Sequence, residues 1–124
     1  MSTLKVTNIQ ATGETASRAV SGVAAAWVNF NGTGTIATRD SENVSSLTDF
    51  ATGRYYVNFS SNMANANYCF TLYTSATDPS SISAFANQYT GGNESTTSSF
   101  GTSSYNAAFV DSDVVTVAIH GDLA

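Results

Sequence analysis

Charged side chains are scarce in this 124-residue sequence, where Asp, Glu, Lys and Arg together make up only 10% of the residues. Nine acids oppose four scattered basic residues, which are Lys5, Arg18, Arg39 and Arg54. Nucleic-acid binding led by phosphate contacts needs a clustered cationic surface. An acidic protein also gains no electrostatic attraction to an anionic membrane. The sequence therefore predicts neither nucleic acid nor a membrane as a partner.

Cysteine and long apolar runs are also nearly absent. Cys69 is the only cysteine, so no internal disulfide can form, and we expect it to be a small buried apolar side chain. No run approaches the ~20 apolar residues that span a bilayer. The first residues lack the apolar core of a secretory signal. We therefore expect a protein made in a cytoplasm, without membrane insertion.

Few residues are suited to catalysis. A nucleophilic triad needs a histidine between a hydroxyl and a carboxylate, and His120 is the only histidine. Asp111 and Asp113 flank Ser112 in a cluster that could ligate calcium, but the cluster lacks a full ligand loop. An ordinary turn before the last strand is the favoured interpretation. The sequence predicts no enzyme, no cofactor and no metal.

Strand and turn residues dominate the chain, while proline is limited to Pro79 and helix-forming residues are scarce. Tyr55, Val57 and Phe59 occupy every second position of residues 54–59 and share one face of a predicted strand. Strand candidates, with turn signals between them, are residues 4–9, 26–30, 35–38, 44–48, 54–59, 68–74, 107–110 and 115–119. Such short, evenly spaced strands predict an all-β antiparallel sandwich, jelly-roll-like or Ig-like, over residues 23–124.

The clearest hairpin is predicted over residues 44–59, where a polar link ending in Gly53 separates two strand-like runs. Gly53 would supply a positive φ there, which other residues adopt only at a cost.

Two stretches are less regular. Residues 9–22 carry few large apolar side chains, and we expect residues 1–22 to form an arm ordered by neighbouring chains, with attachment residues Leu4, Val6 and Ile9. Residues 90–104 are almost wholly Gly, Ser, Thr and Asn, which predicts a long exposed loop. Such loops are often binding surfaces, and the candidate recognition residues are Tyr89, Asn93, Phe100 and Tyr105.

Some side chains have two interpretations. Arg39 could pair with an acid across a subunit boundary, for instance Glu42 or Asp49, or be a solvated surface ion. The tyrosines could form a platform for host sugars or simply favour strands. We expect Tyr55 and Tyr68 to be structural.

One segment carries a resemblance to a known kind of protein. It reads AWVNFNGTGTIATRDS over residues 26–41, NVSSLTD over 43–49, TGRYYVNF over 52–59 and MANANY over 63–68. Together with the opening LKVTNIQ over residues 4–10, it resembles a domain of phage tail-fibre and virion structural proteins, common in marine and cyanobacterial phages. The resemblance covers roughly the first half of the chain. It implies an all-β knob, trimeric assembly and a place on the virion.

The strand at Trp27 is the predicted trimer contact. We expect Trp27 and Phe30 to place two rings in one strand, with Val28 on the opposite face from both, so that the strand buries both surfaces. Three alanines just before it, Ala24, Ala25 and Ala26, are small enough for backbones to approach closely near a three-fold axis.

Two functional hypotheses follow. The first is a trimeric tail-fibre knob on the virion surface that aids host attachment, with a host glycan as a possible partner. The second is a trimeric capsid decoration or cement protein, or a head fibre, that stabilises the shell through an N-terminal arm. Both predict the chain itself and other virion proteins as partners.

Overall fold

Antiparallel strands make up the regular structure of the computed structural model, which describes residues 1–10, 12–75, 85–88, 95–106 and 108–124. The strands are β1 (Asn8–Ile9), β2 (Arg18–Ala19), β3 (Ala24–Asn31), β4 (Ala37–Glu42), β5 (Val44–Ala51), β6 (Arg54–Phe59), β7 (Cys69–Thr74), β8 (Phe85–Gln88), β9 (Ser99–Asn106), β10 (Ala108–Phe109) and β11 (Val115–His120). A 3₁₀ turn, η1 (Val20–Gly22), precedes β3. Within the described residues, no helix is long and apolar enough to cross a membrane.

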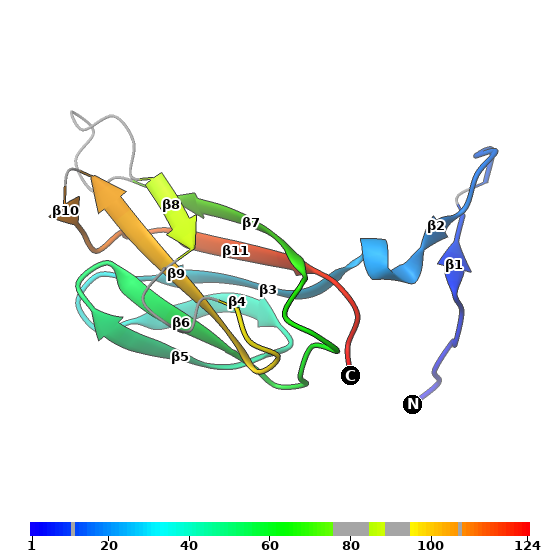
Figure 1. The fold of residues 1–124 in the computed structure, drawn as a ribbon, viewed down its shortest axis with the longest axis horizontal. Coiled ribbons are helices and arrows are strands. Elements are labelled where there is room, and N and C mark those ends of the chain that lie inside the picture. The colour runs from blue at the N-terminus through cyan, green and yellow to red at the C-terminus, as the bar shows by residue number, and fades with distance from the viewer. Residues whose placement is uncertain (11, 76–84, 89–94, 107) are drawn as a thin grey trace.

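Two sheets face each other in the main body (Figure 1). One has the order β4-β3-β11-β7, and the other has the order β10-β9-β6-β5, with β8 also paired to β9. All pairings are antiparallel. The predicted all-β class is confirmed, and the two layers are consistent with a β-sandwich.

The core lies between the sheets and follows the two-residue period of the strands. In β6 and β11 every second residue is buried. The buried hydrophobic side chains are Ala26, Val28, Phe30, Tyr55, Val57, Phe59, Met63, Tyr68, Phe100, Val115, Val117 and Ile119. Burial of each large member stabilises the fold by roughly 1.5–3 kcal/mol, so this interface dominates its stability.

The predicted hairpin over residues 44–59 is present as β5 and β6. Gly53 in the turn has φ +62°, as expected, and it is tightly enclosed. A Cβ placed on Gly53 would lie 2.6 Å from the Ser104 carbonyl oxygen and 2.6 Å from the Val110 backbone. The turn therefore needs glycine for its φ and for the close approach of β9.

The prediction of a loop over residues 90–104 is wrong for the second half of that range, because β9 begins at Ser99. Phe100 is fully buried, with its ring centroid 4.8 Å from that of Phe70, so it belongs to the core and not to an exposed recognition loop. Pairing with β6 on one edge and β8 on the other makes this Ser- and Thr-rich segment a central strand. Tyr89 and Asn93 lie outside the described residues.

Two further predictions about side-chain placement are wrong. Val28 and Phe30 share the buried face of β3, whereas Trp27 points to the other face and is 36% exposed. Cys69 is exposed, because it begins β7 on the face opposite to Phe70. Tyr55 and Tyr68 are buried, as their predicted structural role requires.

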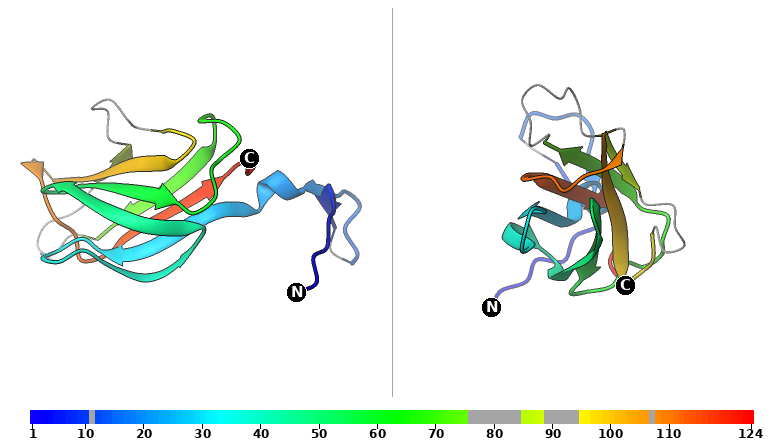
Figure 2. Two further views of the ribbon diagram at one scale, coloured as in Figure 1. Left: turned by 90° about the horizontal axis from the view of Figure 1, so that it is seen from below. Right: turned by 90° about the vertical axis from the view of Figure 1, so that its left-hand side faces the viewer.

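The N-terminal segment lies beyond one end of the sandwich, as Figure 1 shows. Only two residue pairs join β1 to β2, and residues 1–7 are outside any strand, so the strand predicted over 4–9 is reduced to Asn8–Ile9. The views in Figure 2 show η1 connecting this segment to β3.

Candidate interaction surfaces

The sandwich is closed at one end by a polar cluster around Tyr55. The Tyr55 hydroxyl lies 3.0 Å from the Gly32 carbonyl oxygen and 3.1 Å from Asp111 Oδ1. The same carboxylate oxygen accepts a hydrogen bond from the Gly53 amide at 2.6 Å. Burial, followed by the adjacent Asp111 charge, raises the pKa of Tyr55 well above its ordinary value. The cluster ties the β3–β4 turn, the β5–β6 turn and the segment before β11 together.

The cluster holds distant segments together by hydrogen bonds, in a region where the sequence predicts an ordinary turn before β11. Asp111 is committed to two donors, and Ser112 is buried with its hydroxyl 2.5 Å from that of Ser104. Within the described residues, no three or more His, Cys, Asp or Glu side chains are grouped so that they could hold a metal ion. His120 lies at the end of β11, where its Nδ1 is 3.2 Å from the Gly22 carbonyl oxygen.

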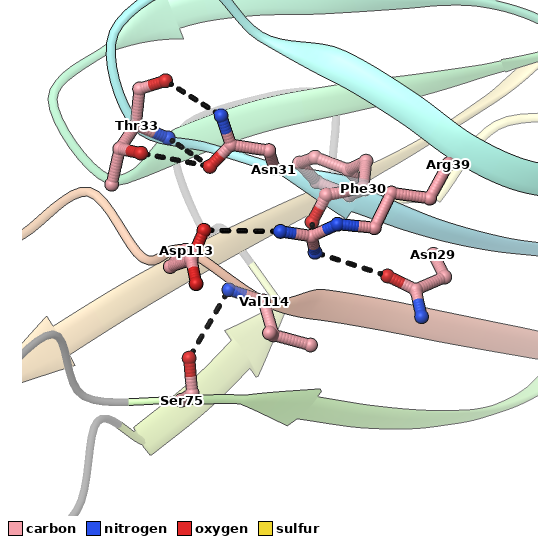
Figure 3. A network of polar contacts seen from close by, with 8 residues as sticks. All are labelled: Asn29, Phe30, Asn31, Thr33, Arg39, Ser75, Asp113 and Val114. Atoms are coloured by element: carbon pink, nitrogen blue, oxygen red, sulfur yellow. Dashed lines mark hydrogen bonds and ion pairs between the residues drawn. The ribbon is translucent and has the colours of Figure 1, made fainter.

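Arg39 forms a small surface network at the edge of β4 (Figure 3). Its guanidinium lies 3.0 Å from Asp113 Oδ1 and donates at 3.2 Å to the Phe30 carbonyl oxygen and at 3.3 Å to Asn29 Oδ1. Within the chain the partner acid is Asp113. A pairing of Arg39 with Glu42 or Asp49 of a neighbouring copy stays a prediction. Both ionic side chains are substantially exposed, so their attraction contributes less than about 1 kcal/mol.

The outer face of the sheet β4-β3-β11-β7 carries exposed rings among small side chains. The register places Trp27 beside Ala118, and Ala118 beside Thr71. Tyr73, which is 58% exposed, lies two residues further along β7. Trp27 is therefore partly accessible to a neighbouring molecule, and it is the large side chain of β3 that faces outward.

The other predicted trimer contacts divide into two groups. Ala26, Val28 and Phe30 are buried in the core of their own chain and offer no surface to a neighbour. Ala24 and Ala25 are partly buried and line a groove at the base of the N-terminal segment.

Tyr105 is the one predicted recognition residue that the structure describes as exposed. Its ring packs edge-on against Phe109 at 5.4 Å between centroids, and the Arg54 guanidinium lies 3.9 Å from the Phe109 centroid. These residues belong to β9, β10 and β6, and the contacts hold Tyr105 at the corner of the sheet.

The predicted attachment residues are exposed. Leu4 is 84% exposed, and Val6 and Ile9 also keep much of their surface. Sequence reasoning missed a groove where the N-terminal segment joins the sandwich, which Val23 and Leu123 help to line. The only available signal was the presence of large apolar side chains in otherwise small and polar segments.

The fold and these surfaces define the class of molecule: a two-sheet antiparallel β-protein with apolar side chains exposed on an N-terminal segment and on one sheet face. Compared with protein-family models, curated proteins and solved structures, the chain matches none of them.

Proposed function

We propose that this chain is a structural protein of a bacteriophage particle. It acts as a homotrimeric knob whose sandwich is of the jelly-roll-like or Ig-like type, and residues 1–22 serve as an arm. Its role is passive, because it binds other virion proteins and presents a neutral, hydroxyl-rich surface outward. The resemblance of residues 4–10 and 26–68 to virion structural proteins supports this proposal.

The exposed apolar N-terminal segment is the observation that carries the proposal. Among the described residues, six of the eleven exposed large hydrophobic side chains lie within residues 1–23, namely Met1, Leu4, Val6, Ile9, Val20 and Val23. Apolar surface gathered on a protruding segment is typical of a segment that becomes buried against a partner. An assembled particle supplies such partners at high local concentration.

The position first proposed is the tail, where the knob aids host attachment. Trp27 and Tyr73 on one sheet face and Tyr105 at a sheet corner are exposed rings of the kind that contact glycans. Purified protein then binds host cells and blocks infection. Failure to do either contradicts the attachment role.

The second position is the capsid, where the chain is a decoration or cement protein. Its specific support is the arm, because an apolar segment that inserts into a neighbour holds a peripheral protein on a shell. Binding only to the assembled shell stabilises that shell by mass action. Deletion of residues 1–10 then releases the protein from the particle but leaves the sandwich folded.

Counting copies in purified particles by quantitative mass spectrometry tests the proposal. Hundreds of copies per particle indicate the capsid, and a small multiple of three indicates the tail. Absence of the chain from purified particles contradicts the proposed function altogether.

A further inference from the structure

A groove of about 260 Å³ lies where the N-terminal segment joins the sandwich. One wall is the C-terminal segment, which backbone hydrogen bonds hold against residues 62–64: the Ala64 amide donates to the Asp122 carbonyl at 2.8 Å, and the Ala124 amide donates to the Asn62 carbonyl at 2.9 Å. The other wall is η1, which the contact between His120 Nδ1 and the Gly22 carbonyl ties to β11. The groove is therefore built between two fixed segments.

The lining of this groove is apolar with one charge. Val20 and Val23 line it from one side and Leu123 from the other, and all three are exposed. Among the described residues that line the groove, Asp122 is the charged one, and it is exposed. The groove thus fits a short aliphatic segment that also carries a cation.

The chain contains such a segment in residues 4–6. Leu4 and Val6 are aliphatic and exposed, and the residue between them, Lys5, is the only lysine in a chain of net charge −5. In an extended chain Leu4 and Val6 point to the same side. Lys5 points to the other side, but its long stem lets the ammonium group reach a carboxylate at the groove rim.

The segment does not occupy the groove of its own copy. Thr7 is held beside Val20, whose amide donates to the Thr7 carbonyl at 3.0 Å, and none of residues 4–6 lines the groove. Leu4 and Val6 are exposed, so they do not pack on their own sandwich. In both views of Figure 2 the N-terminus lies apart from the C-terminus. The C-terminal residue comes directly after Leu123, which lines the groove.

We infer that residues 4–6 of one copy bind in the groove of a second copy, with Lys5 facing Asp122. The occupant is a second copy because the charge and apolar pattern of the groove match this chain's own segment. The inference rests on the proposed homotrimer and specifies its contact. Each copy gives one arm and accepts one, and three such head-to-tail contacts close into a ring.

Cysteine cross-linking tests the contact directly. In a Cys69→Ser background, Leu4→Cys and Leu123→Cys proteins are prepared separately, mixed and oxidised. We expect the mixture to give a disulfide-linked heterodimer, because Leu4 of one copy meets Leu123 of another. Each variant oxidised on its own should give little disulfide-linked dimer. In the double variant the expected product is a covalently linked trimer. A double variant that links only within one chain overturns the inference.

Sedimentation equilibrium with charge variants gives a second readout. Lys5→Asp and Asp122→Lys should each weaken assembly about two- to fivefold, as an exposed ion pair allows, and the combined exchange should restore it. Leu4→Asp should weaken assembly by at least about tenfold, because an aliphatic side chain leaves the groove.

The outcomes separate the contact from the proposed function. If trimers form without the cross-link, and if Lys5→Asp, Asp122→Lys and Leu4→Asp all leave assembly unchanged, the arm contact is overturned while the virion role stands. A wild-type chain that stays monomeric at every concentration overturns both the contact and the homotrimer. Circular dichroism of each variant confirms that the sandwich is folded, which is expected because residues 4 and 5 are exposed.

Discussion

Substitution of Tyr55 by phenylalanine tests the polar cluster that closes the sandwich. The substitution removes the hydroxyl that lies 3.0 Å from the Gly32 carbonyl oxygen and 3.1 Å from Asp111 Oδ1, inside a fully buried site. A buried acceptor that loses its donor costs about 1–3 kcal/mol, so we expect Tyr55→Phe to lower the free energy of unfolding by about 2 kcal/mol at pH 7. Urea denaturation followed by far-ultraviolet circular dichroism measures this change.

The same variant makes a prediction about pH with a definite sign. The ordinary pKa of tyrosine is 10.0, and burial followed by the Asp111 charge raises the pKa of Tyr55 in the folded state. Above pH 10 the unfolded chain loses this proton while the folded chain keeps it, so the stabilisation is complete below pH 10 and declines as the pH rises. At pH 11 the stabilisation lost through Tyr55 is on the order of 1 kcal/mol.

The stability difference between wild type and Tyr55→Phe should therefore narrow from about 2 kcal/mol at pH 7 to about 1 kcal/mol at pH 11. Tyr68, whose pKa burial also raises, titrates in both proteins and cancels in this difference. The control is Tyr73→Phe, which alters an exposed ring and should change stability by less than about 0.5 kcal/mol. A Tyr55→Phe protein as stable as wild type at pH 7, or a difference that widens with pH, refutes the reasoning.

Three further predictions concern the β5–β6 turn, the core and Cys69. Gly53→Ala should destabilise the protein by about 2–4 kcal/mol, because the added Cβ meets the backbone of β9 and of residue 110 at 2.6 Å. Gly34 has a similar φ of +61° but open space around it, so Gly34→Ala should cost about 1 kcal/mol, and thermal unfolding compares the two variants. Phe100→Ala should cost about 3–5 kcal/mol and Phe50→Ala less than about 1 kcal/mol in urea denaturation, and equal losses would contradict the placement of Phe100 in the core. Cys69 should react with a thiol reagent in the native protein as fast as in an unfolded one, and protection of the thiol until unfolding would show that the exposed position is wrong.

Much of the fold could be predicted because several strands carry local signals. The alternation in β6 and β11 and the glycine of the β5–β6 turn are written in neighbouring residues, and each of these predictions is confirmed. The faces of β3 also follow from a local rule, because residues 28 and 30 share a face by the two-residue period. The expectation that Val28 lies opposite Phe30 contradicts this rule and is wrong. The alternation of Phe70 and Leu72 in β7 likewise places Cys69 on the outer face.

Other features depend on contacts between distant parts of the chain. β9 has a single large apolar residue before Tyr105, and its strand state comes from pairing with β6 and β8. Tyr55 and Asp111 are 56 residues apart, and neither signals the other in the sequence. The groove was equally hidden, because its walls come from η1 and from the segment after β11. Local propensity does not report such juxtapositions.

Sedimentation equilibrium of the full chain at micromolar concentration tests most directly the claim that this sandwich works as an assembly. We expect a species of about 39 kDa, three times the 12.9 kDa of one chain, which dissociates when Leu4 is replaced by Asp. A single species of 12.9 kDa across the whole concentration range would contradict it.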